Sequence, residues 1–218
     1  VHKAFPESQG QEVRILEAVD LAVQSGESIA IVGSSGCGKT TLLHLLAGLD
    51  TPSGGQILFR GTDLQELAWD DKSRLRNQHI GFVFQFHHLL PEFTTLENAA
   101  LPAMIRGMDK HQALHSGRRA LERTGLSRQE KQRVNTLSGG ERQLTSIARA
   151  ICLDPEVILA DEPTGDLDPD SGERVADLLV GLNRDLGATL ILATHNLHLA
   201  RKMDRVLQIS SGAVNEPH

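Results

Sequence analysis

The chain has 218 residues and a net charge of −6, with 39% hydrophobic and 23% charged residues. This composition is typical of a globular protein large enough to bury a hydrophobic core, and its acidic balance gives no sign of the basic face that nucleic-acid binders carry. The two cysteines stand far apart, which argues against a disulfide framework. Because no apolar run reaches the ~18 residues of a membrane span, we expect a soluble chain that contacts a membrane only through a partner.

Strands and helices are predicted to alternate along most of the chain. The first part is predicted to contain a buried helix at 40–49, a turn at 61–63 and strands at 13–23, 28–32, 56–59 and 80–85. The last part is predicted to contain helices at 171–183 and 196–202, and strands at 157–160, 189–193 and 205–209. The intervening residues favour helices at 95–104, 112–124 and 141–152. We therefore expect an α/β fold with a mostly parallel sheet and an inserted helical region.

A glycine-rich loop lies between the second predicted strand and the first predicted helix. It matches the phosphate-loop pattern GxxxxGK[ST] with Gly33, Ser34, Ser35, Gly36, Cys37, Gly38, Lys39 and Thr40, and Thr41 follows as a further candidate. Its backbone N–H groups and the start of the helix favour phosphate oxygens, while the lysine supplies a positive charge and the threonine hydroxyl a Mg²⁺ ligand. The loop predicts nucleotide binding, but it does not choose among kinases, GTPases and transport ATPases.

Two adjacent carboxylates end the predicted strand at 157–160. Side chains alternate along a strand, so Asp161 and Glu162 are expected to point in different directions as the strand ends. Asp161 can serve the Mg²⁺ shell, and Glu162 can act as the general base toward an attacking water. The alternative is a helix cap before Pro163.

The segment 137–141 resembles the signature motif of the ATP-binding cassette (ABC) family. Its candidate residues for contacting ATP are Ser138, Gly139, Gly140 and Glu141. A pair of glycines at a helix start offers unobstructed N–H groups, and Ser138 is also a plausible helix cap. In the ABC family the signature of one copy closes over the ATP of a second copy. The resemblance therefore implies MgATP as cofactor and a homodimer that forms on ATP binding.

The remaining motifs of the ABC family follow in order. The resemblance implies that Gln85 serves Mg²⁺ and water, that Asp168 belongs to a loop at the dimer interface, and that His195 orients Glu162. Phe5 stands where the family stacks an aromatic ring on adenine. The catalytic set is thus Glu162, His195, Gln85 and Lys39, and the metal set is Thr40, Gln85 and Asp161.

The family resemblance also implies a domain organisation. Residues 1–218 would form one ABC nucleotide-binding domain, with a P-loop NTPase core and an N-terminal antiparallel β subdomain in 1–85 and 153–218. The helical subdomain that bears the signature would span 86–152.

A narrower resemblance lies in the segment 82–98, with support from 160–165 and 182–184. These residues are similar to the subgroup of lipoprotein-releasing and MacB-type ABC ATPases. That subgroup implies an ATPase at the cytoplasmic face of the bacterial inner membrane, driving lipoprotein release beneath integral permease subunits that dock between Phe86 and Phe93. The alternatives are MacB-type efflux, a cell-division ATPase, a non-transport ABC ATPase and a nucleotide kinase. A nucleic-acid partner is not expected.

The chain departs from the usual family pattern at a few positions. Cys37 stands in place of serine, Asp166 in place of asparagine and Asn196 in place of aspartate. Leu144 replaces an arginine of the signature helix, and this change is expected to weaken a contact at the dimer or subdomain interface. None of the departures alters the predicted catalytic residues.

Overall fold

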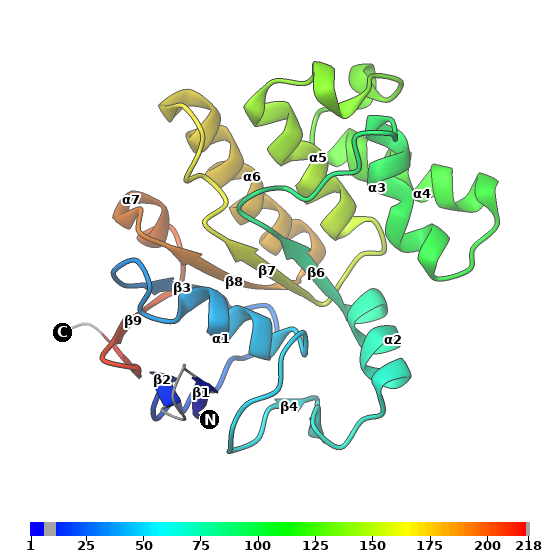
Figure 1. Ribbon diagram of the computed structural model, residues 1–218. Coiled ribbons are helices and arrows are strands. Elements are labelled where there is room, and N and C mark those ends of the chain that lie inside the picture. Colours follow the sequence, from blue (N-terminus) through cyan, green and yellow to red (C-terminus); the bar gives the residue numbers. More distant parts are fainter. Residues whose placement is uncertain (7–11, 217–218) are drawn as a thin grey trace.

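A computed structural model describes residues 1–6 and 12–216 of the chain (Figure 1). Its central sheet has six strands in the spatial order β10 (Ala213–Asn215), β9 (Arg205–Ser210), β3 (Ser28–Val32), β8 (Thr189–Thr194), β7 (Val157–Asp161) and β6 (Ile80–Val83). Strands β9, β3, β8, β7 and β6 are parallel, and β10 pairs antiparallel with β9 at one edge. The predicted α/β fold with a mostly parallel sheet is therefore confirmed.

Both faces of this sheet are buried, which explains why its strands are continuous apolar runs. Alternate side chains face opposite layers, so Ile158 and Leu190 join one core cluster while Leu159 and Ile191 join the other. The second cluster lies against helix α1 (Lys39–Leu46). The first lies against helices α5 (Gly139–Ile151) and α6 (Pro169–Leu186).

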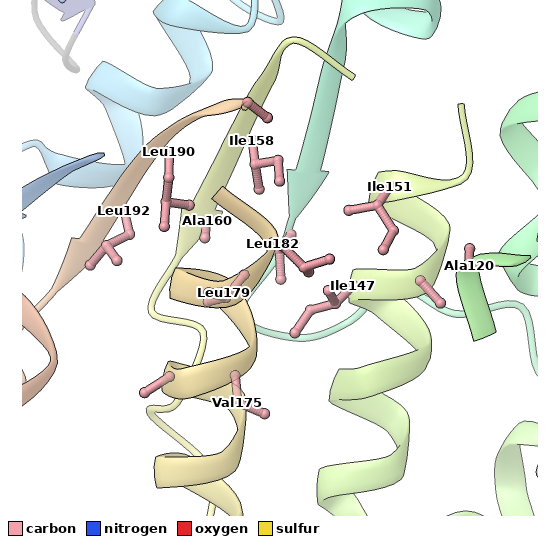
Figure 2. Close-up of a cluster of buried hydrophobic side chains, with 14 of the residues drawn as sticks. Ala120, Ile147, Ile151, Ile158, Ala160, Val175, Leu179, Leu182, Leu190 and Leu192 are labelled. Carbon is pink, nitrogen blue, oxygen red and sulfur yellow. The ribbon is translucent and has the colours of Figure 1, made fainter. Parts of the chain in front are cut away.

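Helices α6 and α5 lie side by side against this face of the sheet, as Figure 2 shows. Its apolar stripe of Val175, Leu179 and Leu182 recurs at helical spacing and is almost fully buried. Ile147 and Ile151 approach this stripe from α5. Each such side chain stabilises the fold by roughly 1.5–3 kcal/mol through removal of apolar surface from water. This packing fixes the C-terminal half of α5 against α6 and the central sheet.

The helical region contains α3 (Thr95–Ile105), α4 (Lys110–Arg123), two short 3₁₀ turns at Ser127–Gln129 and Val134–Thr136, and α5. Each helix starts at a capping side chain, which is Thr94 for α3, Asp109 for α4 and Ser138 for α5. Helices α3 and α4 approach closely because Gly117 has no side chain. A Cβ atom there would lie 3.0 Å from the Cβ of Ala100.

Two small antiparallel hairpins complete the first part of the chain. They are β1 (Lys3–Pro6) with β2 (Glu12–Leu16), and β4 (Leu58–Phe59) with β5 (Thr62–Asp63). The predicted strand at 13–23 is wrong beyond residue 16, because the register with β1 ends at the pair Lys3 and Leu16. The predicted turn at 61–63 is displaced, since the reversal occurs at Arg60 and Gly61, both at positive φ.

Helix α2 (Trp69–His79) was not predicted from the sequence. None of its residues is fully buried, and only Leu75 packs partly against a core cluster, so its sequence has no apolar periodicity. The last helix, α7 (Leu197–Ala200), is shorter than predicted. Among the described residues, no helix is both long and apolar enough to cross a membrane.

Candidate functional site

The candidate site is a cleft of about 630 Å³ at the carboxyl ends of four neighbouring parallel strands. The glycine loop follows β3, His195 follows β8, Glu162 follows β7 and Gln85 follows β6. These strands lie in the order β3, β8, β7 and β6, so their ends meet at one edge of the sheet. Ligand sites of open α/β sheets form at this edge.

The cleft gathers residues from all parts of the chain outside the helical region. Its lining consists of Phe5, Ile15, Ser35, Gly36, Gly38, Lys39, Thr40, Thr41, Gln85, Glu162 and His195. Sequence reasoning missed only Ile15 in this lining. That residue reaches the cleft because the β1–β2 hairpin folds over the glycine loop, and no local motif marks it.

The glycine loop has the backbone geometry that its sequence predicts. Gly36 and Gly38 adopt φ values of +78° and +105°, which L side chains rarely adopt. At Gly33, a Cβ atom would lie 2.6 Å from the sulfur of Cys37 and 2.7 Å from the carbonyl oxygen of Ile209, so only glycine fits there. The loop is therefore packed tightly against β9 behind it.

Lys39 is buried in this loop, with its ammonium turned toward the cleft. Its Nζ donates to the carbonyl oxygens of Gly33 and Ser34 at 3.0 and 3.2 Å. The same Nζ lies 3.6 Å from Oε1 of Glu162. The Lys39 ammonium is thus held by two neutral carbonyl oxygens and one carboxylate.

Glu162 lies at the centre of the candidate site. Its Oε2 is 2.9 Å from Nδ1 of His195 and accepts a hydrogen bond from the His195 backbone N–H at 3.2 Å. The backbone of Glu162 has a φ of +43°, an unfavourable value for a residue with a side chain. Its own N–H donates to Ala193 on β8 at 2.9 Å, which helps to hold this strained conformation.

Asp161 points elsewhere, as the alternation of side chains predicts. Burial raises the pKa of Asp161, while a hydrogen bond from the Thr40 side chain acts in the opposite direction. Its Oδ1 is buried and has no hydrogen-bond partner among the described residues. A buried carboxylate oxygen beside a threonine hydroxyl fits a small divalent cation, which prefers such oxygen ligands.

The signature residues lie outside this cleft. Ser138 and Glu141 form a reciprocal cap: Ser138 Oγ accepts from the Glu141 N–H at 3.2 Å, and Glu141 Oε2 accepts from the Ser138 N–H at 2.8 Å. The Ser138 N–H holds the pKa of Glu141 below its usual value. This cap leaves the N–H groups of Gly139 and Gly140 at the open end of α5.

Asp168 lies next to the signature helix rather than in the cleft. Its Oδ1 accepts from the Ser171 N–H at 3.0 Å and so caps α6. A Cβ atom on Gly140 would lie 3.1 Å from the hydroxyl of the same Ser171. The chain therefore carries two separate sets of candidate residues, one around the glycine loop and one at the starts of α5 and α6.

The departures from the family pattern have structural explanations at two positions. Leu144 packs as a partly buried apolar side chain against the core cluster around α5. Asn196 Oδ1 accepts from the N–H groups of His198 and Leu199 at 2.9 and 3.2 Å and so caps α7.

A phosphate-type glycine loop, an acidic strand end and a histidine around one cleft define a P-loop nucleotide-binding protein. The family model described as ABC transporter matches residues 16–165. The chain belongs to this family, which confirms the resemblance seen in the signature motif.

Two curated relatives are both named lipoprotein-releasing system ATP-binding protein LolD. The one from Nitratidesulfovibrio vulgaris is 52% identical over 209 residues, covering 96% of this chain and 90% of the relative. The one from Coxiella burnetii is 51% identical over 203 residues, covering 92% and 86%. The predicted resemblance to the lipoprotein-releasing subgroup is therefore confirmed.

Solved structures show the same fold. A dimeric ATP-binding cassette, MJ0796, in a post-hydrolysis state with ADP and Pi has a TM-score of 0.91 and 33% identity, covering 99% of this chain and 96% of that one. A second dimeric structure of this bacterial ABC transporter cassette also has a TM-score of 0.91, with 34% identity. The similarity confirms the predicted ABC ATPase fold.

Proposed function

We propose that this chain is the ATP-hydrolysing subunit of an ABC transporter that drives lipoprotein release from the bacterial inner membrane. The observation that supports hydrolysis best is the cleft in which Lys39, Glu162 and His195 meet within hydrogen-bond or ion-pair distance. The substrate class is supported by the relatives named LolD, which match more than nine tenths of this chain at about 50% identity.

In this proposal the cleft binds ATP through complementary contacts at its two ends. Phe5 stacks on the adenine, and the N–H groups of the glycine loop and Lys39 bind the phosphates. Thr40, Asp161 and Gln85 would hold Mg²⁺. The bound ion supplies positive charge to the phosphate oxygens.

Glu162 is the proposed general base and His195 the residue that positions it. The contact of 2.9 Å between His195 Nδ1 and Glu162 Oε2 aims the carboxylate, while the other oxygen faces Lys39. Once phosphate oxygens draw the ammonium away, Glu162 is free to accept the proton of an attacking water. The strained backbone at Glu162 fits a residue held for chemistry rather than for packing.

The second set of residues is proposed to complete the site of another copy. Gly139 and Gly140 present N–H groups, and Ser138 a hydroxyl, at a helix start that lies outside the lining of this cleft. The two dimeric cassettes of the same fold support this arrangement. We accordingly propose a core of 1–85 and 153–218 and a helical subdomain of 86–152 that closes over the partner's nucleotide, with Asp168 at the interface.

The permease subunits are proposed to dock between Phe86 and Phe93. Phe86 and Leu90 expose 70% and 41% of their surface directly after Gln85, although both are large and apolar. An apolar helix from a membrane subunit would cover them. The chain would then work at the cytoplasmic face of the membrane, which it contacts only through these subunits.

The proposal is tested with phosphate release and with membrane reconstitution. Purified chain should release phosphate from MgATP without any acceptor, and Lys39→Met should abolish release because the loop loses its cation. The chain with its co-purified membrane subunits should then release a lipoprotein from proteoliposomes in an ATP-dependent manner. If the complex releases phosphate but no lipoprotein, the chain is still an ATPase, and the proposed transport substrate is refuted.

A further inference from the structure

The turn that follows Gln85 has an unusual backbone. His87 and His88 adopt φ values of +63° and +47°, and neither is a glycine. Residues with side chains are strained in this left-handed region, and here two of them follow one another. Such a turn persists only where neighbouring groups hold it, so its contacts identify what fixes it.

One side chain holds both strained residues. Arg149 of α5 donates from Nη2 to the carbonyl oxygen of His87 at 2.6 Å, and from Nη1 to that of His88 at 2.7 Å. The two terminal nitrogens of a guanidinium form a rigid fork, which suits two carbonyl oxygens that face the same way. Because α5 begins with the signature residues, this fork connects the turn after Gln85 directly to the signature helix.

The other end of the exposed segment is fastened in a similar way. Asn98 of α3 is fully buried, and its Oδ1 accepts from the Leu90 N–H at 2.8 Å. Its Nδ2 donates to the Leu90 carbonyl oxygen at 3.0 Å. The segment 86–90 therefore has one attachment to α5 at His87 and His88 and one to α3 at Leu90, and the exposed Phe86 lies directly before the first of them.

We infer that Arg149 is a positioning residue that fastens the turn after Gln85 to α5, so that Gln85 and the signature residues move together when segment 86–90 is displaced. This inference rests on the proposed function, since it assigns the segment as the place where a membrane subunit pushes. Arg149 touches neither the nucleotide cleft nor the carboxylates at its centre. We therefore expect substitution of Arg149 to change kcat for ATP hydrolysis rather than the affinity for ATP.

The first test is the Arg149→Lys substitution in the full chain. It keeps the positive charge but replaces the fork with a single ammonium, which cannot serve both carbonyl oxygens in the same geometry. We expect kcat for ATP hydrolysis to fall about tenfold, the consequence of losing one charge-assisted hydrogen bond, while KM for ATP stays about constant. Amide exchange at residues 87–90 should become faster, and the thermal unfolding transition should remain cooperative.

The second test separates positioning from general packing. If Arg149 acts by holding a left-handed backbone, His88→Gly should restore kcat and slow exchange in the Arg149→Lys background, because glycine adopts this backbone without cost. His88→Ala is the matched control, since it removes the same exposed imidazole but keeps the backbone penalty. It should not restore either quantity.

Two results would overturn the inference. One is a kcat and an exchange pattern of Arg149→Lys equal to those of the unsubstituted chain. The other is equal rescue by glycine and alanine at position 88, which would attribute the effect to the imidazole. If the unsubstituted chain does not hydrolyse ATP, the proposed function is refuted. The amide exchange at residues 87–90 would still decide whether Arg149 fastens the turn.

Discussion

Replacement of Phe5 by alanine should weaken ATP binding without changing the chemistry at the other end of the cleft. Phe5 lies at the cleft wall with 40% of its surface exposed, and the Nζ of Lys3 lies 4.7 Å from its ring centroid. Lys3 is itself held by Asp50 at 2.7 Å. One face of the ring is thus backed by a fixed cation, which leaves the opposite face for a base.

The expected loss of ATP affinity is estimated from stacking of the adenine on one face of the Phe5 ring. Stacking of a base on an aromatic ring contributes about 1–3 kcal/mol by alanine substitution, or roughly 5- to 150-fold in affinity. Because the ring of Phe5 is partly exposed, we expect the lower part of this range, with Kd for ATP about tenfold higher. The rate at saturating ATP should stay about the same, since Glu162 and His195 are untouched.

The assay is a titration of fluorescent ATP against Phe5→Ala and Phe5→Tyr, with calorimetry as a check. Tyrosine has the same π face, so this control should bind ATP about as well as the unsubstituted chain. An alanine variant that binds ATP within about twofold of the unsubstituted chain would refute the assignment of Phe5 as the stacking residue.

Two further predictions concern the packing of the helices on the sheet. Leu179→Ala should lower the free energy of unfolding in a urea titration by about 2–5 kcal/mol, because Leu179 is fully buried between the sheet and α5; a loss below about 1 kcal/mol would contradict this packing. Burial raises the pKa of Cys152 to about 11, so at pH 8 only roughly one thiol in a thousand is ionised. Iodoacetamide should therefore label Cys152 only after unfolding, and rapid labelling of the folded chain would be inconsistent with its burial.

Much of the candidate site could be predicted because its residues belong to local motifs. Lys39 and Thr40 lie in one short loop, and Asp161 and Glu162 end one apolar strand, so local patterns identify them. The order of the strands then brings the loop, the carboxylates and His195 to the same edge of the sheet. The alternation along β7 also predicts that Asp161 and Glu162 point apart.

The sequence could not predict features that depend on tertiary contacts. Ile15 reaches the cleft through a hairpin whose register is set by pairing with β1. Helix α2 packs against the core mainly through the partly buried Leu75, and a single apolar contact gives no periodic pattern to detect. The strained residues His87 and His88 and their contact with Arg149 join positions about sixty residues apart, and no local rule connects them.

In the proposed function, the signature residues of one copy complete the nucleotide site of another copy. The most direct measurement is the mass in solution of the Glu162→Gln chain with MgATP, determined by light scattering. We predict a species of twice the chain mass, which should revert to the single-chain mass when Gly140→Asp places a carboxylate at the start of α5. The proposed dimer would be contradicted by a Glu162→Gln chain that binds ATP and still has the mass of a single copy. It would also be contradicted by a complex with the membrane subunits that contains only one copy of this chain.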